Sequence, residues 1–221
     1  MTRSDPYAEE ASLAKSASLI RFVLASASPR RRDLLAALGV EFEVRAGSVD
    51  ETTALLDPGQ VVLHLSLLKA QAVAAELTSD GRRQLVLGAD TIVVLAGKIL
   101  GKPASSAEAI AMLTSLSGQE HQVFTGITLL DSQGQTESVF CVSRVFFRAL
   151  ASAEIRYYVS TGEPMDKAGA YALQGIASAF VERIDGCYTN IIGLPMPSTI
   201  SLLRRHGLEV LGLPPNTEGA R

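Results

Sequence analysis

A strand, a tight turn and a helix follow one another near the start of the chain, and this unit restricts the fold more than any other feature. Residues Ile20–Ala25 are a short apolar run rich in strand formers. In the turn that follows, Ser28 can cap a helix, and Pro29 suits the first helical position because its missing N–H would be unpaired there. Leucines at helical spacing then lead to Gly39, a natural helix stop.

The rest of the chain alternates helices and strands early and pairs strands by turns later. The pattern predicts strands over 42–45, 85–95, 98–100, 121–130 and 136–147, helices over 61–77, 106–118, 152–159 and 197–206, and a last hairpin joining 179–184 to 187–192. This order predicts an α/β protein with a mixed sheet. A cleft between two lobes is compatible with the pattern, but periodicity alone does not establish it.

Length and composition indicate one globular unit. The 221 residues are 47% hydrophobic and 19% charged, an ordinary balance for a folded domain. We expect a mobile extension over 1–18, a single domain over 19–207 and a loose tail over 208–221. The extension lacks the apolar core of a signal peptide, and no apolar run reaches the roughly 18 residues of a membrane span.

The two cysteines indicate the redox compartment of the protein, and the charge balance indicates which partners it can bind. Cys141 and Cys187 form neither a disulfide framework nor a zinc motif, which suits a reducing cytoplasm. Lys and Arg total 20 against 23 Asp and Glu, and aromatic residues make up 5%, so neither a basic field nor a stacking platform for nucleic acid is expected.

Several well-known catalytic motifs are missing. The sequence has no G-x-x-x-x-G-K-[ST] phosphate loop, no G-x-G-x-x-G fingerprint, no H-E-x-x-H and no G-x-S-x-G. His64, His121 and His206 are scattered, and each is interpreted as a surface or packed residue. The chemistry must therefore come from charged and hydroxyl residues at strand ends, where open α/β sheets bind ligands.

The turn after the first strand is the main candidate for an anion site. It places Ser26, Ser28 and the guanidiniums of Arg30, Arg31 and Arg32 at a helix N-terminus. Such a terminus offers free N–H groups and partial positive charge, and arginine grips phosphate with a planar fork. The alternative is a capped helix with a solvated basic first turn.

Carboxylates and lysines elsewhere could complete this site. Asp90 stands at the C-terminal end of the apolar run 85–89 or just inside it, and it is placed to hold Mg²⁺ or to activate water. Lys69 and Lys102 could supply positive charge, and either Asp50 or Glu51 could coordinate a metal. The alternatives are a turn-capping aspartate, solvated lysines and a solvated acidic loop. Taken together, these residues indicate phosphate ester chemistry.

Ordered segments of the chain resemble a known family. They are Leu24-Ala25-Ser26-Ala27-Ser28-Pro29-Arg30-Arg31, Gly88-Ala89-Asp90-Thr91, Gly101-Lys102-Pro103, Leu116-Ser117-Gly118, Thr125-Gly126, and Asp166-Lys167-Ala168-Gly169-Ala170-Tyr171 with Gln174-Gly175. The family is the septum-formation (Maf) family of nucleoside triphosphate pyrophosphatases. The resemblance runs from about Phe22 to about Leu203.

This resemblance implies an elongated α/β fold akin to inosine triphosphate pyrophosphatase, with a cleft between two lobes. It implies hydrolysis between the α and β phosphates with a divalent cation, Mg²⁺ or Mn²⁺, and a possible homodimer. The catalytic and metal-binding aspartate falls on Asp90, and the second acidic residue falls on Asp50 or Glu51, with Glu51 preferred. The triphosphate-binding residues fall on Ser26, Arg30, Arg31, Lys69 and Lys102.

The family divides according to the base of the nucleotide. The branch that hydrolyses dTTP and UTP has specificity residues that match Arg30, Thr91 and Gln174, whereas a 7-methyl-GTP branch has a glutamate-containing segment where Gln174 stands. An amide can donate to and accept from a pyrimidine edge, so Gln174 favours the dTTP and UTP branch. The competing interpretation is a nucleotide-binding regulator of cell division without catalysis.

Overall fold

The computed structural model describes residues 20–216, so the predicted extension over 1–18 lies outside the described residues. No helix in this part of the chain is long and apolar enough to span a bilayer. In chain order, the elements are β1 Ile20–Ala25, α2 Pro29–Ala36, β2 Glu43–Arg45, α3 Pro58–Glu76, β3 Arg83–Leu95, β4 Lys98–Leu100, α4 Ser106–Leu116, β5 Glu120–Asp131, β6 Thr136–Phe147, α5 Ser152–Ser160, β7 Val181–Asp185, α6 Tyr188–Ile192 and α7 Met196–Arg205. Short 3-10 turns over Glu163–Asp166, Ala168–Ala170 and Ile176–Phe180 lie between α5 and β7.

The strands form a mixed sheet in the order β2-β1-β3-β5-β6-β7, with β4 paired to the end of β3. β1 runs parallel to both β2 and β3. From β3 to β7 the neighbouring strands are antiparallel. Parallel pairs need a crossover helix, whereas antiparallel pairs need only a turn. The predicted α/β class with a mixed sheet is confirmed.

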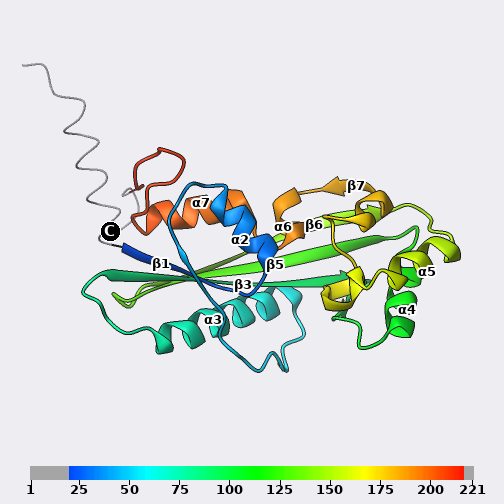
Figure 1. Cartoon of the computed structure of the whole chain (residues 1–221), viewed down its shortest axis with the longest axis horizontal. Helices are drawn as coiled ribbons and strands as arrows, with labels where there is room; N and C mark the ends of the chain where they lie inside the picture. The colour runs from blue at the N-terminus through cyan, green and yellow to red at the C-terminus, as the bar shows by residue number, and fades with distance from the viewer. Residues whose placement is uncertain (1–19, 217–221) are drawn as a thin grey trace, which may run out of the picture.

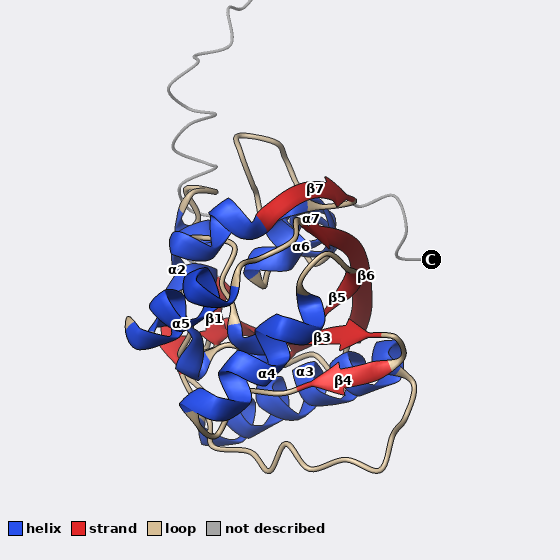
Figure 2. Cartoon of the chain, turned by 90° about the vertical axis from the view of Figure 1, so that its right-hand side faces the viewer, coloured by secondary structure: helices blue, strands red, loops and turns tan. Residues whose placement is uncertain are grey.

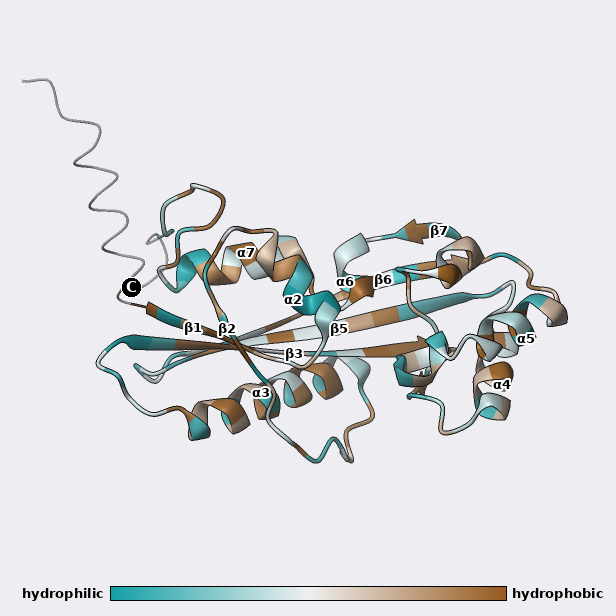
Figure 3. Ribbon diagram, in the orientation of Figure 1, coloured by the Kyte–Doolittle hydropathy of each residue, from teal (hydrophilic) through white to brown (hydrophobic). Residues whose placement is uncertain are grey.

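Helices cover both faces of the sheet around β1 (Figure 1). Phe22 and Leu24 pack with residues of α2 and α7, whereas Val23 and Ala25 pack against α3. Alternate residues of a strand point to opposite faces, so a strand buried on both faces is apolar throughout. β3 is hydrophilic at its start and hydrophobic toward its end, and it is buried over most of its length from Leu85 on (Figure 3).

A second lobe forms where β3, β5 and β6 continue past the end of β1. Here α4, α5 and β4 surround the strand ends (Figure 2). Leu113 of α4, Tyr158 of α5 and Phe147 of β6 belong to one buried cluster of this lobe. The same long strands therefore run through both lobes, and any site at the end of β1 lies between them.

α3 lies unusually close to the sheet because two glycines face it. A Cβ atom at Gly88 would lie 2.1 Å from the carbonyl oxygen of Ser66, and one at Gly126 would lie 2.3 Å from that of Val62. The hydroxyl of Ser66 also shares a hydrogen bond of 2.8 Å with that of Thr128 on β5. At these two positions the helix backbone lies directly on the strands, while apolar side chains of α3 pack on the sheet around them.

The predicted last hairpin is wrong in its second arm. β7 pairs with β6, but residues 188–192 form the short helix α6. The amide of Asn190 is buried and donates to the Val123 carbonyl and to the Ser143 hydroxyl, each at 2.9 Å. A run of five residues is too short for its periodicity to separate a buried helix from a strand, and this buried amide anchors the helix.

The prediction of a loose tail over 208–221 is wrong for its first residues. Leu208 and Val210 are buried in the cluster that contains β1 and α7. Their apolar side chains follow the end of α7 and cover the open end of the core. Residues 217–221 lie outside the described part of the chain.

His121 is packed in the second lobe, as expected. It is 1% exposed, its Nε2 lies 2.8 Å from the hydroxyl of Tyr171, and its ring makes edge contacts with Phe147 and Tyr171. Its Nδ1 has no hydrogen-bond partner among the described residues. Burial lowers the pKa of His121 from 6.5 to about 4.

We expect Gly126→Ala to destabilise the protein by about 1–3 kcal/mol, because the new methyl group collides with the backbone of α3. Gly101→Ala is the matched control, since no atom lies within 4 Å of the added carbon. The control should change stability by less than about 0.5 kcal/mol. Urea unfolding measures both variants. Equal stability of the two variants would show that α3 does not depend on this close approach.

His121 should make the stability depend on pH. Its folded pKa lies below the unfolded value, so the unfolded chain binds more protons between pH 6.5 and about 4. The contribution of His121 is therefore complete above pH 6.5 and is lost as the pH falls toward 4.

From about pH 7.5 to about pH 5, wild type should lose about 2 kcal/mol more stability than His121→Phe. The exposed His64 supplies the control variant His64→Gln, which should follow the wild-type curve. Urea unfolding at several pH values measures the difference. Parallel curves for wild type and His121→Phe would contradict the account.

Candidate active site

A pocket of about 840 Å³ opens where β1 ends, between the two lobes. β1 stops at Ala25, which pairs with Gly88, so the next residues of β3 have no neighbour on that side. The residues predicted for the site line this pocket: Ser26, Arg30, Arg31, Glu51, Lys69, Asp90, Thr91, Lys102 and Gln174. The structure therefore brings together side chains that are spread over most of the chain.

Of Asp50 and Glu51, only Glu51 lies in the pocket. Glu51 lines the pocket, whereas Asp50 is exposed, accepts a hydrogen bond from the backbone of Thr52 and is not among the lining residues. The Lys69 ammonium holds the pKa of the Glu51 carboxyl below 4.5, and the charges of Lys102 and Arg31 act in the same direction. Glu51 thus belongs to the charged cluster of the pocket.

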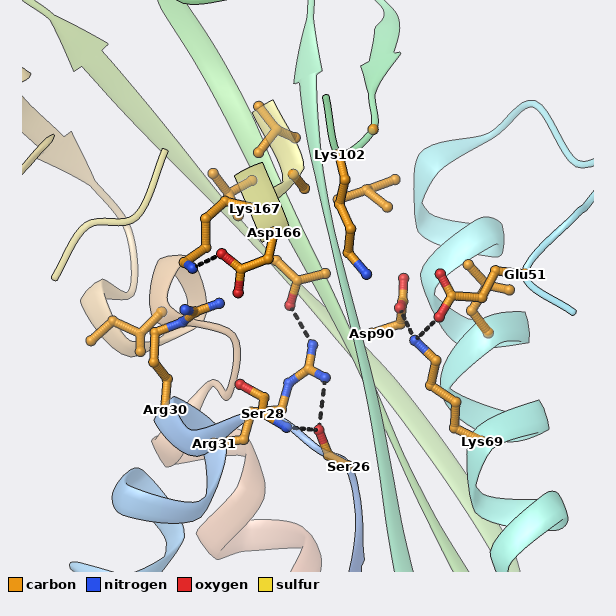
Figure 4. A pocket seen from close by; sticks show the side chains of 18 of the residues that line it. Ser26, Ser28, Arg30, Arg31, Glu51, Lys69, Asp90, Lys102, Asp166 and Lys167 are labelled. Carbon is orange, nitrogen blue, oxygen red and sulfur yellow. Dashed lines mark hydrogen bonds and ion pairs between the residues drawn. The ribbon is translucent and has the colours of Figure 1, made fainter. Parts of the chain in front are cut away.

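Lys69 stands between two carboxylates. Its Nζ lies 2.5 Å from Oδ1 of Asp90 and 2.8 Å from Oε1 of Glu51 (Figure 4). Asp90 is 6% exposed, so the carboxylate is taken out of water and needs a charged partner. Lys69 reaches it because Gly88 and Gly126 bring α3 onto the strand that carries Asp90, and Gly126 pairs with Asp90 across the sheet.

The turn between β1 and α2 is stabilised differently from the prediction. Ser28 occupies the N-cap position and Pro29 begins the helix, as expected, but the Ser28 hydroxyl makes no capping bond. Instead, the Ser26 hydroxyl accepts from the backbone N–H of Ser28 at 3.2 Å. The hydroxyl of Ser28 and the first N–H groups of α2 therefore remain available at a helix end that favours anions.

Arg31 is tied into the protein by three hydrogen bonds. It donates to the carbonyl of Gly193 at 2.8 Å, to the hydroxyl of Ser26 at 3.2 Å and to that of Thr91 at 3.0 Å. Burial lowers the pKa of its guanidinium below the usual arginine value, and the Asp90 carboxylate opposes this shift. Arg31 thus links the β1–α2 turn, β3 and the segment that follows α6.

The polar chain behind Arg31 was missed by the sequence analysis as a group. The Thr91 hydroxyl shares a hydrogen bond of 2.9 Å with that of Thr125, which donates to the backbone carbonyl of Asn190 at 2.8 Å. Thr125 is fully buried in an apolar strand. The Thr125-Gly126 motif was the available signal, but the hydrogen-bond partners of Thr125 are far apart in sequence.

Two neighbouring residues of β3 contact opposite sides of the site. Asp90 contacts Lys69 on the α3 side, and Thr91 contacts Arg31 on the α2 side. Alternate residues of a strand point to opposite faces, and both faces are reachable here because β1 has ended. The pocket therefore brings carboxylates and cations together around one strand.

The rim of the pocket that belongs to the second lobe carries further charges. Lys102 is exposed beyond β4, and the ion pair of Asp166 and Lys167 faces Arg30 (Figure 4). Gln174 is exposed on the segment that follows the buried Tyr171 and Leu173. The pocket thus combines a charged centre with a partly apolar wall, an arrangement suited to a polyanion that carries an aromatic or sugar group.

Two structural comparisons give only distant likeness. The dITP/XTP pyrophosphatase of Mycobacterium abscessus is 14% identical with a TM-score of 0.38, over 59% of this chain and 75% of that chain. The Ham1 protein of Staphylococcus aureus is 15% identical with a TM-score of 0.40, over 57% of this chain and 71% of that chain.

Comparison by sequence finds much more similar proteins. A protein of Pelotomaculum thermopropionicum named dTTP/UTP pyrophosphatase is 49% identical over 86% of this chain and 98% of its own length. One of Deinococcus radiodurans with the same name is 43% identical over 87% of this chain and 96% of its own length. The family described as Maf-like protein matches residues 21–206. Because this match covers the whole pocket and both lobes, the chain belongs to the Maf-like protein family.

Proposed function

We propose that this protein is a nucleoside triphosphate pyrophosphatase that hydrolyses dTTP and UTP to the monophosphate and pyrophosphate. The observation that carries the proposal is the buried Asp90 carboxylate, held by Lys69 inside a pocket lined with Arg30, Arg31 and Lys102. A polyphosphate needs such cations, and a hydrolytic water needs such a carboxylate. The names of relatives that match the chain over nearly their full lengths support the choice of dTTP and UTP.

The phosphates would lie over the turn between β1 and α2. Arg30 and Lys102 extend into the pocket and would neutralise the β and γ groups, while the free N–H groups at the start of α2 would bind phosphate oxygens. Three donors of Arg31 are already used within the protein. Its main effect would be to fix the Ser26 turn and to add positive charge beside the α-phosphate.

Asp90 would act as the general base. Its carboxylate would accept a proton from the water that attacks the α-phosphorus, and the bond from phosphorus to the bridging oxygen would break as pyrophosphate leaves. Lys69 fixes the orientation of Asp90 through one of the carboxylate oxygens, which leaves the other oxygen for the water. Positioning and charge neutralisation provide most of the rate gain in such transfers.

The residues present fit a divalent cation. Asp90 and Glu51 already surround one cation position, now taken by the ammonium of Lys69. The described residues contain no group of three or more histidine, cysteine or acidic side chains that could hold a metal by themselves. Mg²⁺ commonly uses one or two carboxylates together with substrate phosphates, so Asp90 and Glu51 are suitable ligands. When bound, Mg²⁺ or Mn²⁺ would neutralise phosphate charge and acidify water.

Base selection would depend on the exposed Gln174. Its amide can donate to and accept from a pyrimidine edge. Thr91, the second candidate for specificity, has its hydroxyl bonded to Arg31 and Thr125, so it would act by holding Arg31 in place. Arg30, the third, stands at the rim and could contact either phosphate or base. The expected homodimer and cytoplasmic setting stay predictions, and every residue used here comes from one chain.

The substrate class is tested by measuring pyrophosphate release with Mg²⁺ from dTTP, UTP, CTP and 7-methyl-GTP. We expect dTTP and UTP to be hydrolysed at least about tenfold more efficiently in kcat/KM than the other two, the discrimination typical of one or two specific hydrogen bonds. Preference for 7-methyl-GTP would overturn the assignment of the base. Tight nucleotide binding without pyrophosphate release would indicate a non-catalytic regulator.

Asp90→Asn should lower kcat by at least about 100-fold, because it removes the base while preserving its shape. Asp50→Asn is the matched control, since the Asp50 carboxylate, next to Glu51 in the sequence, does not line the pocket. It should retain nearly all activity. Thermal unfolding checks that both variants are folded. An Asp90→Asn enzyme with more than about half the wild-type rate would exclude Asp90 as the base.

A further inference from the structure

Two charged side chains of the pocket have no part in the reaction described above. Asp166 ends one 3-10 turn, Lys167 precedes the next, and both line the pocket. They form an ion pair between Nζ of Lys167 and Oδ1 of Asp166. The Lys167 side chain is only 12% exposed, whereas that of Asp166 is 74% exposed. The ammonium thus lies against the pocket wall, and the carboxylate stands in front of it.

The backbone that follows Lys167 is closely packed at Gly169 and strained at Ala170. Gly169 and Ala170 have φ angles of +68° and +59°, a left-handed conformation that a non-glycine residue seldom adopts. A Cβ atom at Gly169 would lie 3.0 Å from the side chain of Val93 on β3. Such strain persists only where the surroundings fix the chain, so the position of Lys167 is well defined.

The same segment is fastened to the loop that carries Lys102. The N–H of Gly169 donates to the carbonyl of Gly101 at 3.0 Å, one residue before Lys102. The side chains of Lys102 and Lys167 both line the pocket from this shared support. Both lysines therefore extend into the pocket from the second lobe, Lys102 toward Asp90 and Glu51 and Lys167 toward Arg30 (Figure 4).

Asp166 interacts with cations from both lobes. The hydrogen bond from Lys167 is the main reason that the pKa of the Asp166 carboxyl lies below 3.8, and the positive charge of Arg30 on α2 contributes (Figure 4). The Asp166 carboxylate pairs with the Lys167 ammonium and lies in the field of the Arg30 guanidinium, so it stands where a phosphate oxygen could pair with the same cations. It is also exposed enough to turn away.

We propose that Lys167 is a phosphate-binding residue of this pocket, and that the Asp166 carboxylate occupies its ammonium until a phosphate of the nucleotide displaces it. The inference rests on the proposed function, because it adds a contact to the same triphosphate. No covalent bond changes in this step, since one ion pair replaces another. With the nucleotide bound, Arg30 from one lobe and Lys167 from the other would hold the same phosphate tail. Asp166 is a positioning residue that keeps the two cations apart and oriented in the empty pocket.

The test compares Lys167→Met with Asp166→Asn and uses Lys98→Met as the matched control. Lys98 is an exposed lysine of β4 that is not among the pocket-lining residues. Isothermal titration measures the Kd of inorganic triphosphate and of a non-hydrolysable α,β-imido analogue of dUTP, each with and without Mg²⁺. Lys167→Met should weaken both Kd values by about tenfold or more, the usual effect of losing one charge-assisted hydrogen bond. Lys98→Met should leave them unchanged.

Asp166→Asn gives the decisive result. Removing a competing anion should make the Kd of triphosphate tighter, an outcome that simple structural damage does not produce, and an unchanged Kd would overturn the displacement of Asp166. Weaker binding in Asp166→Asn, especially only with Mg²⁺, would overturn displacement and indicate that Asp166 binds the metal or the substrate. Unchanged binding in Lys167→Met would overturn the role of Lys167. Lys167→Arg keeps the charge and should bind within a few fold of wild type, which covers the case in which Lys167→Met does not fold.

Different experimental results would contradict the role of Lys167 and the proposed activity. If wild type binds triphosphate in a Lys167-dependent manner but releases no pyrophosphate from any nucleotide, the activity is wrong and the phosphate contact stands. If wild type hydrolyses dTTP and Lys167→Met retains its Kd and KM, the activity stands and the contact is wrong.

Discussion

The contact of α3 with the sheet at Gly88 and Gly126 is the constraint on which the site depends. Without side chains at these positions, the helix backbone lies directly on β3 and β5, and Lys69 reaches the buried Asp90 carboxylate. A larger residue would push the helix outward and leave a charge buried without its partner, which is a costly arrangement. Packing and electrostatics are thus coupled, because the same close approach that builds the core also places the charge pair.

Carboxylates balance several of the cations that line the pocket. Lys69 is neutralised by Asp90 and Glu51, and Lys167 is neutralised by Asp166, which also faces Arg30. Arg31 instead donates hydrogen bonds to the protein itself, and it thereby joins the turn after β1, β3 and the segment after α6. This division explains how several like charges coexist in one cavity: some are paired with acids, and one is fixed in the wall by hydrogen bonds.

Local patterns predicted much of this arrangement, and long-range contacts explain the rest. The apolar run of β1, Pro29 at the start of α2 and the carboxylate at Asp90 follow from short sequence windows. The partner of Lys69 does not, because it depends on two glycines in different strands that face one helix. The helix at 188–192 and the buried Leu208 and Val210 were missed for the same reason: tertiary packing decides short segments whose local signal is weak. The ordered family motifs, rather than periodicity, indicated which of these polar residues share a pocket.

The central claim is that Asp90 and Glu51, held together by Lys69, form the reaction centre for a nucleoside triphosphate. A crystal structure of the protein with Mn²⁺ and the α,β-imido analogue of dUTP tests it most directly, because the anomalous signal locates the metal. The account predicts a Mn²⁺ peak in contact with both carboxylates and the α-phosphate beside Asp90. A metal bound elsewhere, or an α-phosphate remote from Asp90, would contradict it.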